Sequence, residues 1–181
     1  MIGAMNELDD AQWYALRVVP QKEYTVAYLL EKRDVWAYVP TGINWRKRTW
    51  HAKAKAEYAC PERPGLIFAR FSGAPAWYNV LKNHLILGPI GRNGEPWRFD
   101  PAQLYSYFAR VPNGTLVFKD GEQLVHVNGR NLRAPTTQTR FISKHRKDTD
   151  APLVIEPTRQ ERIALQAMLL RVNPQPVLAA A

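Results

Sequence analysis

Strand-like and helix-like segments alternate between residues 13 and 110, and this alternation limits the possible folds more than any other feature of the sequence. Residues 13–19 are rich in aromatic and β-branched side chains and end at a proline, which predicts a strand. Residues 21–33 carry apolar side chains at helical spacing, which predicts a helix. The same criteria predict further strands over 36–40, 64–71 and 85–87, and further helices over 76–84 and 101–110. Such an order predicts a mixed α/β domain.

The remaining residues carry different signals. Asp120-Gly121 lies between two strand-like runs and predicts a two-residue hairpin turn. Thr158 and Glu161 form a capping box that predicts the start of a C-terminal helix. We expect this helix to bury one face, which would carry Ile163, Ala167 and Leu170. The expected organisation is an N-terminal tail (1–12), a first domain (13–110), a hairpin and basic linker (111–155), a C-terminal helix (156–173) and a tail (174–181).

The charge balance is basic, with 25 Lys and Arg against 16 Asp and Glu and a net charge of +9. This balance favours nucleic acid or an acidic protein surface as a partner. Two stretches rich in Lys and Arg contain no acidic residue. In them we expect nucleic-acid contacts from Arg46, Lys47, Arg48, Lys53 and Lys55, with Trp50 stacking on bases, and from Arg140, Lys144, Arg146 and Lys147. The alternative for both stretches is a solvated charged face.

No motif predicts catalysis. Cys60 is the single cysteine, no histidine lies near it at a catalytic spacing, and the four histidines are scattered. We therefore predict no catalytic residue, no metal and no cofactor. The apolar runs are shorter than a membrane helix requires, and the N-terminus lacks the pattern of a secretory signal. We expect a cytoplasmic protein, monomeric on its own, without a membrane partner.

The order and spacing of several short fragments resemble the N-terminal domain of the NusG family of transcription elongation factors. The fragments lie between residues 13 and 110. They are Trp13-Tyr14, Lys22-Glu23, Tyr38-Val39-Pro40, Pro64-Gly65-Leu66-Ile67-Phe68, Trp77, Gly88-Pro89-Ile90-Gly91 and Pro96. The resemblance implies an α+β sandwich with a four-stranded, mainly antiparallel sheet flanked by helices.

The resemblance also implies a function in transcription. Family members bind the clamp helices of the large RNA polymerase subunit and suppress pausing, and specialised members act as antiterminators. For this chain, the resemblance implies a polymerase-binding surface and a second polymerase contact. The first maps to Arg17, Lys22, Pro64, Leu66 and Phe68, and the second to Trp77, Tyr78 and Asn79. We expect the Leu66 and Phe68 face of the strand to be the docking surface, solvated in the free protein.

The chain departs from the family pattern in two ways. Arg63 stands where an aromatic residue usually precedes the Pro-Gly pair. Residues 111–181 lack a convincing Gly-rich signature of the usual C-terminal KOW barrel, and the hairpin at 115–130 is at best a remnant of it. Loss of that domain would suit a specialised antiterminator, of bacterial or phage origin. Two other hypotheses remain: a basic DNA- or RNA-binding module that acts without polymerase, and an enzyme built around Cys60.

Overall fold

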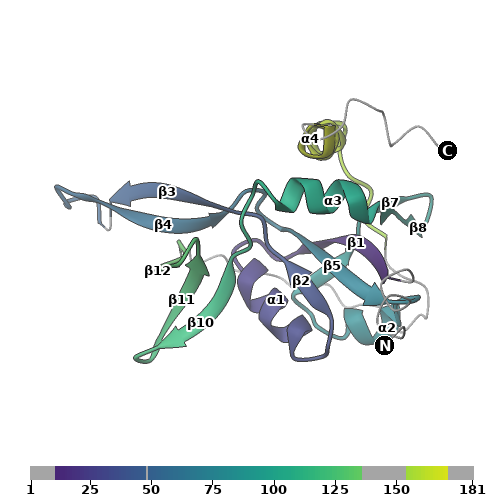
Figure 1. Ribbon diagram of the computed structural model, residues 1–181, viewed down its shortest axis with the longest axis horizontal. Coiled ribbons are helices and arrows are strands. Elements are labelled where there is room, and N and C mark those ends of the chain that lie inside the picture. Colours follow the sequence, from purple (N-terminus) through teal and green to yellow (C-terminus); the bar gives the residue numbers. More distant parts are fainter. Residues whose placement is uncertain (1–10, 48, 136–153, 171–181) are drawn as a thin grey trace, which may run out of the picture.

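The centre of the molecule is an antiparallel sheet in which β1 (Ala11–Val18) is the middle strand (Figure 1). The computed structural model describes residues 11–47, 49–135 and 154–170. The strand order is β2 (Trp36–Tyr38), β5 (Leu66–Ser72), β1 and β6 (Ile86–Pro89). A fifth strand, β9 (Arg98–Phe99), pairs with the start of β1. The expected mixed α/β fold with an antiparallel sheet is confirmed, with β9 as an addition to the expected four strands.

Both faces of the sheet are buried. Side chains alternate along a strand, so Trp13 and Ala15 of β1 point to one face while Tyr14 and Leu16 point to the other. All four are at most 3% exposed. The two faces belong to two separate hydrophobic clusters, which we call the upper core (around Trp13) and the lower core (around Leu16).

Two helices and a small sheet cover the lower core. The helices are α1 (Glu23–Glu31) and α2 (Trp77–Leu81). The small sheet is a meander of β10 (Thr115–Lys119), β11 (Glu122–Val127) and β12 (Arg130–Leu132). Its turns lie at Asp120-Gly121, as expected, and at Asn128-Gly129, where all four residues have a positive φ. Val125 and Val127 of β11 are 1% exposed and lie in the lower core.

The upper core lies beneath two helices, α3 (Pro101–Phe108) and α4 (Arg159–Leu170) (Figure 1). The Asp100 side chain caps α3 by accepting a hydrogen bond from the Ala102 N–H at 3.1 Å. The predicted buried face of α4 is wrong. Leu165 and Met168 are the buried side chains, whereas Ile163 is 56% exposed and Ala167 is exposed. The side chain of Leu170 lies outside the described part.

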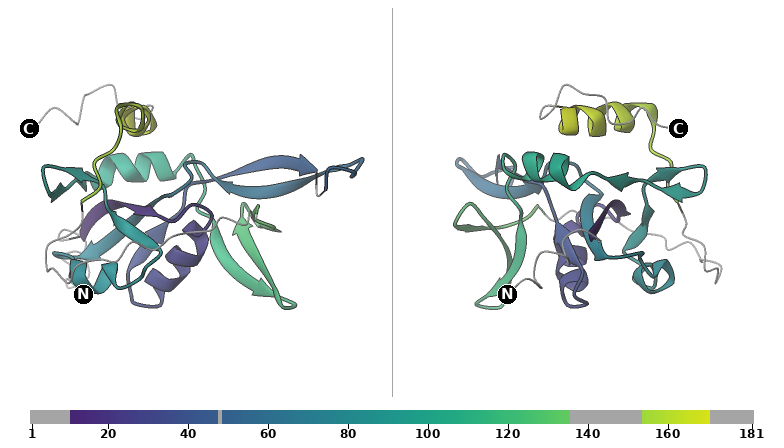
Figure 2. Two further views of the ribbon diagram at one scale, coloured as in Figure 1. Left: turned by 180° about the vertical axis from the view of Figure 1, so that it is seen from behind. Right: turned by 45° about the vertical axis from the view of Figure 1, so that its right-hand side comes forward.

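A long hairpin of β3 (Thr41–Lys47) and β4 (Lys55–Pro61) projects from one end of the sheet, and the meander projects beside it (Figure 2). At the other end, a short hairpin of β7 (Gly91–Arg92) and β8 (Glu95–Pro96) precedes β9. Ile155 exchanges backbone hydrogen bonds with this region, donating to Pro89 at 2.8 Å and accepting from Gly91 at 3.1 Å. These bonds place α4 over the upper core.

Residue 110 does not separate two independent packing units. The Thr41 N–H donates to the carbonyl of Pro112 at 2.9 Å, and the Asn113 side chain accepts from the Val39 N–H at 2.8 Å. Gly114 fits against β3 so closely that a Cβ atom there would lie 2.3 Å from the Thr41 hydroxyl oxygen. Since the meander also completes the lower core, we do not expect residues 13–110 to fold stably alone.

Candidate functional site

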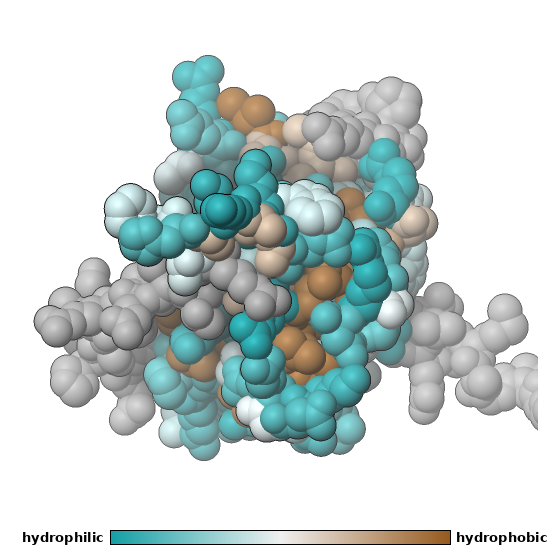
Figure 3. All heavy atoms as spheres, turned by 90° about the vertical axis from the view of Figure 1, so that its left-hand side faces the viewer, coloured by the Kyte–Doolittle hydropathy of each residue, from teal (hydrophilic) through white to brown (hydrophobic). Residues whose placement is uncertain are grey.

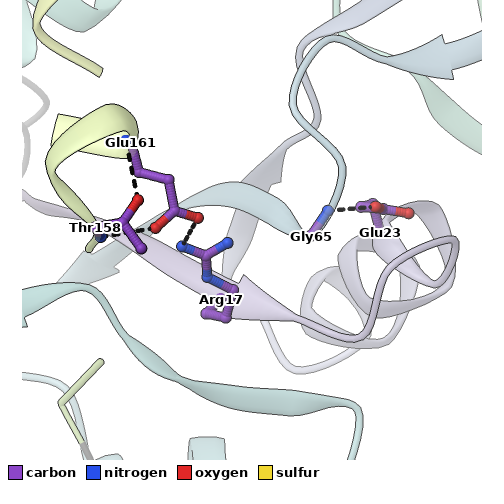
Figure 4. Close-up of polar contacts among 5 residues, drawn as sticks. All are labelled: Arg17, Glu23, Gly65, Thr158 and Glu161. Atoms are coloured by element: carbon purple, nitrogen blue, oxygen red, sulfur yellow. Dashed lines mark hydrogen bonds and ion pairs between the residues drawn. The ribbon is translucent and has the colours of Figure 1, made fainter. Parts of the chain in front are cut away.

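The turn between β4 and β5 is fixed against the end of β1 and the start of α1 (Figure 4). The Glu23 carboxylate is fully buried and accepts a hydrogen bond from the Gly65 N–H at 2.6 Å, and the Gly65 carbonyl accepts from the Val18 N–H at 2.9 Å. Gly65 has φ +78°, which favours glycine, and a Cβ atom there would approach the Val18 carbonyl oxygen to 3.2 Å. The Pro-Gly pair therefore has a clear structural role, and Pro64 itself is exposed.

Arg17, at the end of β1, lies beside this turn and beneath the start of α4 (Figure 4). Its guanidinium forms an ion pair with the Glu161 carboxylate at 2.6 Å, and its side chain is 19% exposed. Glu161 also completes the predicted capping box: its carboxylate accepts from the Thr158 N–H at 2.9 Å, and the Thr158 hydroxyl accepts from the Glu161 N–H at 3.2 Å. Partial burial raises the pKa of Glu161, but these bonds outweigh it and hold the pKa below its usual range.

The prediction that Leu66 and Phe68 form a solvated face is wrong. Leu66 is 5% exposed and Phe68 is 0% exposed, and both lie in the upper core. The Phe68 ring lies 5.7 Å from the ring of Phe99 and 5.7 Å from that of Phe108, so α3 and β9 help to cover it. Leu66 is the register partner of Arg17 and lies on the same face, close to the start of α4. The free protein therefore hides the apolar part of the expected docking surface.

The residues of the expected second polymerase contact lie on α2. Trp77 is partly buried, with its ring 5.1 Å from Tyr14 and 5.8 Å from Phe71, so it belongs to the lower core. Tyr78 is 45% exposed, and the Lys82 ammonium lies 4.5 Å from its ring centroid. The backbone carbonyl of Asn79 accepts a hydrogen bond from Arg33 at 3.3 Å. Tyr78 and Asn79 are thus exposed, whereas Trp77 is not.

Lys22, the remaining residue expected to bind polymerase, is exposed at the N-terminal end of α1. It makes no side-chain capping bond there. Lys22 is therefore an exposed cation next in sequence to the buried Glu23.

The basic residues expected to meet nucleic acid divide into two groups. The hairpin presents exposed Arg46, Lys47, Lys53 and Lys55, together with Trp50, which is 83% exposed. Arg48, Arg140, Lys144, Arg146 and Lys147 lie outside the described residues. The hairpin also carries Trp45. This residue lies within the regular β3–β4 ladder, and its side chain is 61% exposed. A protein rarely exposes two tryptophans on one projecting element, so the hairpin is a candidate binding element.

Sequence reasoning missed the groove at the base of the hairpin. It lies between the hairpin and the meander, with a volume of about 400 Å³. The signal for its second wall was present in Asn128-Gly129, a favoured hairpin turn that predicts a third strand after β11. No pattern in the sequence indicates that β12 lies against β4.

Possible metal ligands, the single cysteine and the helix lengths are the remaining features of the described part of the chain. No group of three or more His, Cys, Asp or Glu residues there is arranged to hold a metal ion. Cys60 is a partly buried free thiol on β4. Of the helices the structure describes, none is both long and apolar enough to cross a membrane.

The sequence model of the family described as "Transcription termination factor nusG" matches residues 11–106, which is more than half of the chain. The match spans the central sheet, the β3–β4 hairpin, the first two helices and most of α3. The chain belongs to the NusG family, whose members are transcription factors that act on elongation and termination rather than enzymes. No curated protein matches the chain. The meander and α4 lie beyond the matched residues.

Proposed function

We propose that the protein binds the clamp helices of the large RNA polymerase subunit in the cytoplasm and suppresses pausing or termination. The observation that carries the proposal is the convergence of Arg17, Pro64 and Leu66 at one end of the sheet, within the family-matched region. The cation and the apolar side chain suit a coiled coil with acidic flanks. Lys22 adds an exposed cation at the start of α1, and Tyr78 and Asn79 are the exposed members of the second contact.

Docking at this surface requires α4 to move away. In the free protein the Arg17 guanidinium is already paired with Glu161, and Leu66 is 5% exposed. Phe68 contacts α3 and β9, which belong to the central fold, so it supports the surface from beneath rather than touching polymerase. The proposed contact residues of the first surface are therefore Arg17, Lys22, Pro64 and Leu66.

The basic hairpin is proposed to contact DNA or RNA of the elongation complex. Its exposed cations can meet phosphates, and its exposed tryptophans can stack on unpaired bases. The same hairpin favours the second candidate function, a nucleic-acid-binding module that acts without polymerase. The two candidates differ in whether the protein stays on polymerase once the nucleic acid is destroyed.

Pause and terminator readthrough with purified polymerase tests the proposal. Wild-type protein is expected to increase readthrough, and Arg17→Glu is expected to reduce its affinity for polymerase roughly tenfold because the charge is reversed at the contact. Arg98→Glu is the matched control, since Arg98 is exposed on β9 and lies outside the proposed surface. Equal loss in both variants would contradict the assignment of Arg17.

A further inference from the structure

We propose that the groove between the β3–β4 hairpin and the β10–β12 meander binds one unpaired base of a single-stranded nucleic acid. The groove has a volume of about 400 Å³. Its walls include Trp45 and Tyr58 from the hairpin and Leu124, Asn131, Leu132 and Arg133 from the meander and the residue after it. The inference rests on the proposed contact of the hairpin with nucleic acid and adds a defined base site to it.

The two walls are joined at their base. The Ala59 N–H of β4 donates to the Arg133 carbonyl at 3.0 Å, and Tyr58 and Arg133 form a parallel bridge. Farther out, the Arg130 guanidinium binds the Glu57 carboxylate at 2.7 Å. Backbone and side-chain bonds therefore hold the meander against the hairpin, and the groove has two fixed walls.

Trp45 lies on the hairpin face that is turned toward the meander. In the β3–β4 ladder Trp45 pairs with Glu57, so the two side chains share a face, and Glu57 reaches Arg130 of β12. The Trp45 side chain is 61% exposed even though it borders the groove. An indole ring left this open beside an apolar wall provides a stacking surface for a planar group.

Charge around the groove selects a nucleic acid as the occupant. Arg46 and Lys47 follow Trp45 directly, and Lys55 stands opposite Lys47 in the ladder; all three are exposed. The acidic side chain in the groove, Glu57, is already paired with Arg130. A phosphate backbone can therefore run along the cations of the hairpin while one base enters the groove. Figure 3 views the molecule from the hairpin end, where hydrophobic residues are visible among hydrophilic ones.

The occupant must be single-stranded because stacking on Trp45 requires the face of an unpaired base. Polar side chains in the wall can meet its edge: Asn131, whose Oδ1 lies 2.8 Å from His126 Nδ1, and Arg133, which is held by the Glu122 carboxylate at 2.6 and 2.9 Å. The meander wall follows the family-matched residues 11–106. The proposed site therefore combines the β3–β4 hairpin, which lies within the family-matched residues, with the meander, which lies beyond them.

The test compares two fluorescent oligonucleotides on the full-length protein: a short oligothymidylate and an oligomer of the same length and charge made of abasic sites. Wild type is expected to bind oligothymidylate roughly tenfold more tightly, because one stacked base contributes about that factor. Trp45→Ala is expected to abolish this preference and leave affinity for the abasic oligomer unchanged. Phe118→Ala is the matched control and should keep the preference, since Phe118 is 56% exposed on β10 and does not line the groove. Trp50→Ala tests the other exposed tryptophan of the hairpin. Trp45 is mostly exposed, so its replacement leaves the fold intact.

Four results would overturn the inference. A preference that persists in Trp45→Ala, or that disappears in Trp50→Ala alone, would move the base site away from the groove. Loss of polymerase binding by Trp45→Ala with oligonucleotide affinity unchanged would make a polymerase segment the occupant. If wild type has no affinity for either oligonucleotide, the hairpin does not bind single-stranded nucleic acid. Retention on nuclease-treated polymerase tests the proposed function separately.

Discussion

The helices α3 and α4 cover the same core but are attached to it differently. α3 follows β9 directly, and the Asp100 side chain caps its first turn. It buries Leu104 and Tyr107, which are 0% and 3% exposed. α4 lies beyond the family-matched residues and begins with an ion pair from Glu161 to Arg17. The difference indicates that α3 is part of the fold, whereas α4 is a cover over a surface proposed for polymerase.

The largest effect should come from placing a charge beneath α3. We expect Phe68→Asp to cost about 3–5 kcal/mol in the free energy of unfolding, because an unpaired charge would replace a fully buried ring. That is much of the total stability of an ordinary domain. Urea unfolding followed by circular dichroism measures the loss. Phe118→Asp is the control, since Phe118 is 56% exposed; similar stability of both variants would mean that α3 does not close this face.

A matched pair of truncations in the upper core compares the two helices directly. Leu104→Ala in α3 should cost about 3–5 kcal/mol, and Met168→Ala in α4 should cost closer to 2 kcal/mol. Leu104 is 0% exposed and Met168 is 6% exposed. Chemical denaturation of the two variants gives both values. A larger cost for Met168→Ala would show that α4 is as integral to the fold as α3.

A smaller effect on stability is expected from the ion pair that holds the start of α4. Glu161→Gln keeps a side chain able to complete the capping box but removes the charge, so unfolding should become easier by less than about 1 kcal/mol. Retention on polymerase should rise roughly threefold, since Arg17 is released. Arg162→Gln, at the exposed neighbouring position, is the control. Unchanged retention would show that the ion pair does not compete with polymerase.

The smallest effect is on the pH dependence of stability. The pKa of Glu161 is lowered in the folded protein, so its ionised form stabilises the fold. This contribution is complete above the ordinary glutamate pKa of about 4.3 and is lost as the pH falls through the lower folded value. The stability difference between wild type and Glu161→Gln should therefore be constant near neutral pH and vanish in acid. A difference that grows in acid would contradict the ion pair.

The elements of the sandwich were predictable because local signals and tertiary packing agree. The turn at Asp120-Gly121 and the capping box at Thr158 and Glu161 are both confirmed. These signals are local, because each depends on residues only a few positions apart in the sequence. Strand alternation likewise placed the residues of β1 and β5 on two faces.

The two wrong predictions concern which face is covered, which depends on distant residues. In β5 the four consecutive residues from Leu66 to Ala69 are all apolar, a pattern typical of a strand buried on both faces. In α4 the apolar residues surround much of the helix, so the pattern fits either Ile163 or Leu165 as the centre of the buried face. The ion pair from Arg17 to Glu161, 144 positions apart in the sequence numbering, and the groove at the hairpin could be found only in the structure.

Retention of the full-length protein on purified RNA polymerase, before and after nuclease treatment, tests the central claim most directly. The proposed contact is made by Arg17, Lys22, Pro64 and Leu66 with a protein surface, so the protein should remain on polymerase after all nucleic acid is digested. Release of the protein by nuclease would contradict this account and favour a module that binds nucleic acid without polymerase.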